Sequence, residues 1–264
     1  MRSFAKAWPF FLAAAVAGGA PLLRYVGPTL DVLSLVEMAA ILVGTPVAMI
    51  CGPLVLGAVR GWDWPAAIGF YIVFHATYYL AYLLAPSTDQ LLGVAQLGAG
   101  AAMAVLSLGI GASGRELSQG RRLLSRGPLL DASPYLAGIG AWAAISWVWA
   151  LGEQVCDVAA PGPLCGALGY SRDFGWLDGL FLLLTQPTLA FLAMMLLAIR
   201  RGGDLLTAAL CLIVAIALPT AYYSSYTRAV EWMLGTWLYS AIPAAGGFAI
   251  GLLLHRSLLK RHPA

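Results

Sequence analysis

The sequence predicts an all-α fold, a polytopic transmembrane helical bundle of about eight spans with both chain ends in the cytoplasm. Apolar residues make up 61% of the 264 positions, and charged residues make up only 10%. The mean hydropathy is +0.82. Because an ordinary soluble domain carries roughly 25% charged residues, so little charge cannot cover a surface that faces water.

Long apolar stretches divide the chain. At about 20 apolar residues per membrane-spanning helix, each stretch is long enough to cross a bilayer when tilt is allowed. The stretches cover residues 8–26, 33–59, 65–85, 90–112, 134–151, 175–199, 205–226 and 235–255. Residues 1–264 are therefore expected to form a single transmembrane domain, because the segments between the stretches are too short for a separate soluble domain.

Basic residues concentrate on alternate sides of these stretches. If the chain begins inside and crosses at every stretch, 12 of the 15 lysines and arginines fall in inner segments. Arg24, Arg172 and Arg228 alone fall outside. Such a bias is typical of cytoplasmic loops, and one missed helix would invert it. It predicts a multi-pass protein of the cytoplasmic (inner) membrane with lipids as partners, and it explains the net charge of +3 without a nucleic-acid partner.

The first stretch has a second interpretation. Arg2 and Lys6 precede an apolar run, and residues 15–17 (Ala, Val, Ala) resemble the small-residue site at which a signal peptide is cleaved. In that case seven spans remain, and their orientation is unchanged.

Cys156 and Cys165 lie in the longest outer loop, residues 152–174, whereas Cys51 and Cys211 lie within apolar stretches. The outer compartment is oxidising, so the sequence predicts a disulfide between Cys156 and Cys165. A pair of free thiols is the alternative. A metal site would need further His or Cys side chains in the loop, and the loop contains none, so neither a metal nor a cofactor is expected.

The largest inner segment is residues 113–133, in which arginines are interleaved with leucines. This pattern is typical of a short amphipathic helix that lies on anionic headgroups. A coupling surface for a cytoplasmic ATPase is the alternative.

The two halves of the chain share a weak similarity. Tyr78, Tyr79 and Tyr82 at the outer end of the third stretch resemble Tyr222, Tyr223 and Tyr226 at the outer end of the seventh. A parallel duplication of four spans plus four would place the two groups in matching positions, as in some transporters. Chance similarity between two aromatic belts is the alternative.

His75 stands at the midpoint of the third stretch. On a helix, Tyr71, His75, Tyr78, Tyr79 and Tyr82 share one face. Such a row of hydrogen-bonding rings would suit the wall of a cavity that opens to the outside and binds an amphipathic or cationic solute. In the alternative, the tyrosines belong to the aromatic belt and His75 joins two helices by a hydrogen bond.

Three further polar side chains are expected at bilayer depth. Glu37 lies near the outer end of the second stretch, Gln96 in the outer third of the fourth, and Gln186 near the middle of the sixth. An ionisable group at the bilayer centre costs about 2.5 to 3.5 kcal/mol, so Glu37 is a candidate proton or cation site if it faces the bundle. Amides at depth commonly join helices, which is the alternative for both glutamines.

Three functional hypotheses follow, and none of them depends on a specific catalytic or nucleotide-binding motif. The first is a transport or permease-type protein with an outward-facing cavity for a small solute. The second is a non-catalytic subunit of a larger membrane complex or a homo-oligomer. The third is an enzyme that modifies a lipid or isoprenoid, with Glu37 and His75 as acid and base. An enzyme is the less favoured class, because the sequence contains no specific catalytic motif. The candidate cavity residues are Glu37, His75, Tyr78, Tyr79, Tyr82, Gln96, Gln186, Tyr222, Tyr223 and Tyr226.

Overall fold

The computed structural model describes residues 7–19, 44–84, 94–120, 175–204, 206, 209 and 230–260. These residues form helices and no strand, so the predicted all-α class is confirmed for them. The helices are α2 (Trp8–Gly18), α4 (Thr45–Arg60), α5 (Trp64–Leu84), α6 (Val94–Ser118), α9 (Gly175–Arg201) and α11 (Val230–Lys260). The stretch at 134–151, almost all of the stretch at 205–226 and the outer loop at 152–174 lie outside the described residues.

Within the described residues, one segment, Ala241–Leu259 of α11, is long and apolar enough to cross a membrane by itself. Two shorter apolar helices, Trp8–Gly18 and Pro46–Arg60, accompany it. Only 17% of the α11 segment is buried against the rest of the protein, unlike the core helix of a soluble protein, which is mostly buried. Helix length and composition thus support one span, and the eight-span arrangement remains a prediction.

The helix boundaries have local causes. α4 ends where Gly61 adopts a positive φ of 75°, and the Gly61 N–H donates a hydrogen bond to the carbonyl of Gly57 at 2.7 Å. Asp63 then caps the N-terminus of α5, because its Oδ1 accepts a hydrogen bond from the N–H of Ala66 at 3.1 Å. α6 continues to Ser118. Residues 113–118, expected to begin the inner loop, therefore extend a helix.

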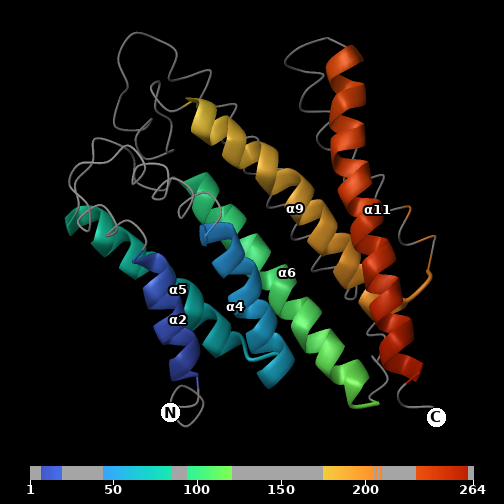
Figure 1. The fold of residues 1–264 in the computed structure, drawn as a ribbon, viewed down its shortest axis with the longest axis horizontal. Coiled ribbons are helices and arrows are strands. Elements are labelled where there is room, and N and C mark those ends of the chain that lie inside the picture. Colours follow the sequence, from blue (N-terminus) through green and yellow to red (C-terminus); the bar gives the residue numbers. More distant parts are fainter. Residues whose placement is uncertain are drawn as a thin grey trace.

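The helices pack as three close pairs, α2 with α5, α4 with α6, and α9 with α11, and α6 also packs on α9 (Figure 1). In the first two pairs, the partners are not neighbours in the order of the described helices. Figure 1 shows α6 in the middle of the group, between α4 on one side and α9 on the other.

Glycines bring the paired helices into backbone contact. A Cβ atom at any of five glycines would collide with a carbonyl oxygen of the partner helix: Gly18 at Phe74, Gly57 at Leu108, Gly111 at Leu54, Gly247 at Phe191 and Gly251 at Met195. Gly247 and Gly251 are four residues apart, and Ala14 and Gly18 have the same spacing, with Ala14 fully buried. Small residues at this spacing are typical of helix pairs in membranes, where close van der Waals packing replaces the hydrophobic effect.

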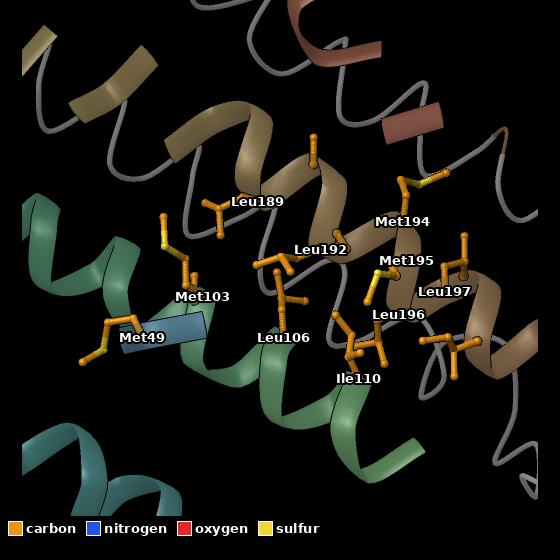
Figure 2. Close-up of a cluster of buried hydrophobic side chains, with 14 of the residues drawn as sticks. Met49, Met103, Leu106, Ile110, Leu189, Leu192, Met194, Met195, Leu196 and Leu197 are labelled. Carbon is orange, nitrogen blue, oxygen red and sulfur yellow. The ribbon is translucent and has the colours of Figure 1, made fainter. Parts of the chain in front are cut away.

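Apolar side chains fill the space between α6 and α9 and also cover the outer faces of the helices. Met103, Leu106 and Ile110 of α6 meet Leu192 and Leu196 of α9 in one buried cluster (Figure 2). Large apolar side chains are exposed at the same time, and they include Leu12, Val16, Val55, Val59, Ile68, Ile72, Ile242 and Leu253. The outside of this helix group is therefore apolar along much of its length.

Candidate functional site around His75

His75 is buried inside the helix group, with 7% of its surface exposed. Neither ring nitrogen has a hydrogen-bond partner in the part of the chain that the structure describes. Its ring lies edge-on to Tyr71, with ring centres 4.3 Å apart, and to Phe74, with ring centres 5.1 Å apart. An imidazole has a donor and an acceptor to satisfy, and a buried polar group without a partner costs about 1 to 3 kcal/mol.

The imidazole faces α6 and α4 rather than the outer surface. A methyl group built on Gly100 of α6 would lie 3.6 Å from Nε2 of His75 and 3.8 Å from Sδ of Met49. Three helices therefore meet at Gly100, and α5 contributes a histidine, α4 a methionine, and α6 a residue without a side chain. A lipid-facing His75 would have contradicted both the transport and the enzyme hypotheses, and the structure places it against protein.

The row of rings on α5 lies on the same side as His75. Tyr78 is buried and stacks on Phe74 with ring centres 6.4 Å apart, and Tyr79 lies edge-on to Tyr78 at 6.3 Å. Tyr71 and Tyr79 are half-buried. Ile68, Ile72 and Leu80 of the same helix are more than half exposed. Phe70, Phe74 and Ala81 are buried. His75 and Tyr78 are thus on the buried side of α5, and Tyr71 and Tyr79 are only partly covered.

α2 closes one side of this row. Gly18 packs against the Phe74 carbonyl, and a Cβ atom on Gly18 would lie 3.2 Å from the backbone nitrogen of Tyr78. The contact at Gly18 lies at the level of His75 along α5, because Phe74 precedes His75 directly in the sequence. The first helix therefore helps to bury the rings next to the histidine.

The remaining candidate residues are not placed by the structure. Tyr82, Gln96 and Gln186 belong to α5, α6 and α9, but their side chains lie outside the described part. Glu37, Tyr222, Tyr223, Tyr226, Cys156 and Cys165 lie outside the described residues altogether. Proximity of Glu37 to His75 therefore stays a prediction.

The structure adds three residues that the sequence patterns did not single out, namely Met49, Gly100 and Ser107. The Ser107 hydroxyl of α6 is fully buried and has no hydrogen-bond partner among the described residues. A methionine or glycine within an apolar stretch resembles any other core residue. The only signal was the run of small residues at 98–102, which indicates that another helix approaches closely.

A second polar group, called here the arginine cluster, comprises Arg60, Arg115, Arg200 and Arg201 at the C-terminal ends of α4, α6 and α9. Arg60 pairs with Asp63 at 2.7 Å, and Arg201 pairs with Asp204 at 3.1 Å. Cations at helix C-termini are favourable because the last carbonyl groups carry partial negative charge.

The arginine cluster also ties neighbouring helices together. A guanidinium nitrogen of Arg115 donates to the carbonyl of Val59 on α4, and one of Arg200 donates to the hydroxyl of Ser113 at 3.3 Å. At the end of α11, Nδ1 of His255 donates to the Ile199 carbonyl at 2.7 Å. Four helices thus end close together, at the side that the sequence predicts to be cytoplasmic.

Conventional metal ligands are not grouped in the described ranges, since no three His, Cys, Asp or Glu side chains lie together there. The chemical resources near His75 are instead an imidazole, aromatic rings and a thioether. No family model, curated protein or solved structure matches the chain.

Proposed function

We propose that this chain is an integral membrane transport or permease-type protein whose solute site is built around His75. In this proposal about eight helices cross the cytoplasmic membrane with both chain ends inside, and a polar and aromatic cavity opens to the outer side. The observation that carries the proposal is the buried imidazole of His75, whose two nitrogens have no hydrogen-bond partner among the described residues and which lies where three helices meet.

Membrane insertion is supported by the distribution of side chains. Large apolar side chains cover the outer faces of α4, α5 and α11. Their exposure to water would be unfavourable, whereas contact with lipid would not. Small residues occupy the contacts between paired helices, as in membrane bundles. The arginine cluster gathers at one end, which agrees with the bias of basic residues toward inner segments.

A solute site near His75 is supported by the cost of leaving this group unsatisfied. Free nitrogens in a buried imidazole lower stability unless a ligand or a bound water compensates for them. Glu37 and the second group of tyrosines, Tyr222, Tyr223 and Tyr226, would complete the cavity if the seventh helix lies beside the third. The proposed repeat of four spans plus four gives the two groups of tyrosines matching positions in the two halves.

The test is solute binding and flux with matched variants. The purified full chain is screened for small solutes that raise its melting temperature, and each such solute is then measured for uptake into proteoliposomes. His75→Phe and Glu37→Gln are expected to weaken binding by about tenfold or more, equivalent to about 1.4 kcal/mol. Ser107→Ala is the control, because it removes a different buried and unpartnered polar group from α6. Binding and uptake that survive both replacements would contradict the proposal.

A subunit role in a larger membrane complex is the second candidate. It is favoured by the exposed apolar side chains of α11, such as Ile242, Ile250 and Leu253, which would accept another helix as well as lipid. Purification from native membranes in a mild detergent separates the two candidates. A lone chain or a homodimer would count against the subunit role.

A further inference from the structure

Gly100 lies next to two potential metal-donor atoms, an imidazole nitrogen and a thioether sulfur. The methyl position of Gly100 lies 3.6 Å from Nε2 of His75 and 3.8 Å from both Cγ and Sδ of Met49. The two donors come from different helices and flank the same point. A methyl group at position 100 would be in van der Waals contact with both donors, and glycine keeps a side chain out of this contact.

Both donors are shielded from solvent. Met49 is 1% exposed and His75 is 7% exposed. The nitrogens of His75 have no partner in the described part of the chain, so Nε2 keeps its capacity to bind a ligand.

This donor set selects among ligands. Thioether sulfur is a soft ligand that favours Cu(I), whereas Mg²⁺ and Ca²⁺ require oxygen ligands. The acidic side chains that the structure describes, Asp63, Glu116 and Asp204, belong to the helix ends near the arginine cluster. Neutral donors in an apolar setting also favour a single positive charge, because burying each further charge is costly.

We infer that His75 and Met49 form a binding site for a soft monovalent cation, Cu(I) or Ag(I). The Met49 side chain has three rotatable bonds, which allow its sulfur to move toward the imidazole when the ion binds. The rings of Tyr71 and Phe74 contact the imidazole edge-on. The inference rests on the proposed function in that it names the solute class of the same site.

The experiment titrates the full chain in detergent with Cu(I) under anaerobic conditions, and separately with Ag(I). Because thiolates also bind these ions, all four cysteines are first replaced by serine. A single ion per chain is expected, and Met49→Leu or His75→Phe should weaken its binding by about tenfold or more. Met194→Leu is the matched control, since Met194 is a buried methionine of α9 that lies well apart from Met49 in Figure 2.

X-ray absorption of the copper-loaded chain identifies the donors. Thioether sulfur together with imidazole nitrogen is expected, and the nitrogen contribution should disappear in His75→Phe. If the cysteine-free chain does not fold, Met49→Leu is compared with Met194→Leu in the natural sequence, where the thiols contribute equally to both. Equal affinity of these two variants, or no ion bound in the parent chain, overturns the inference.

Flux measurements keep this inference separate from the transport proposal. Cu(I) or Ag(I) bound at His75 without any uptake into proteoliposomes supports the metal site and contradicts transport. Uptake of another solute that depends on His75, in a chain that binds neither ion, supports transport and overturns the metal site.

Discussion

The guanidinium carbon of Arg200 lies 5.6 Å from the centre of the Trp62 ring, so the end of α9 rests on the turn that joins α4 to α5. The same side chain reaches the hydroxyl of Ser113 on α6. One arginine therefore connects elements that are more than 80 residues apart in sequence. The contacts of Arg200 and the hydrogen bond from Arg115 to Val59 join α4, α6 and α9 at one end of the helix group.

The pairing of Arg200 with Trp62 is expected to contribute measurably to stability. Cation–π pairs contribute about 0.5 to 1 kcal/mol when exposed and about 2 kcal/mol when desolvated. A double-mutant cycle with Arg200→Gln and Trp62→Leu, followed by denaturant unfolding in detergent, should give a coupling energy of about 1 kcal/mol. Arg256→Gln, at an exposed position of α11, serves as the control. Additive effects of the two replacements would show that the ring contact contributes nothing.

The glycines between α9 and α11 allow a prediction with a neighbouring control. A Cβ atom at Gly247 would collide with the Phe191 carbonyl, whereas a Cβ atom at Gly246 has only the Phe191 ring edge at 4.0 Å. Gly247→Ala should therefore destabilise the protein by about 1 to 3 kcal/mol, as overpacking usually does. Gly246→Ala should change stability little, which the melting temperatures of both variants will show. Equal melting temperatures would mean that the two helices are not in backbone contact.

Replacing His75 by phenylalanine is expected to separate stability from function. The variant removes a buried polar group without a partner and keeps a ring in contact with Tyr71 and Phe74. Its free energy of unfolding should be unchanged or raised by about 1 kcal/mol, while solute binding is lost. The check is denaturant unfolding of the ligand-free chain. A loss of several kcal/mol would instead identify a hydrogen-bonded structural histidine.

The orientation in the membrane can be tested with reporter fusions. A fusion after Gly120, next to the end of α6, is expected to place green fluorescent protein in the cytoplasm, where it fluoresces. A fusion after Asp157, in the expected outer loop, should give active alkaline phosphatase, which requires the oxidising outer compartment. Each reporter is also fused at the other position as a control. Phosphatase activity at Gly120 would reverse the proposed orientation.

Several features of the fold follow from the sequence because they are local. The turn after Arg60 is signalled by Gly61 and by Asp63 ahead of a proline, and α4 and α5 meet there. The common face of Tyr71, His75 and Tyr78 was also predictable, because their spacing sets it on any helix. The end of α6 could not be predicted from the sequence, because the polar residues 113–118 resemble a loop. In the structure these residues are helical, and Arg115 among them contacts α4.

The sequence by itself determined the helical class of the described residues, the high apolar content of the chain, and the helix face that His75 shares with tyrosines. These properties depend on composition and on a repeat of a few residues. Only the tertiary structure decided that Gly100 and Met49 face His75, because they lie on other helices and no short-range pattern sets the register between helices. That register is set by the backbone contacts at glycines such as Gly18, Gly57 and Gly111, where the absence of a side chain lets one helix approach another.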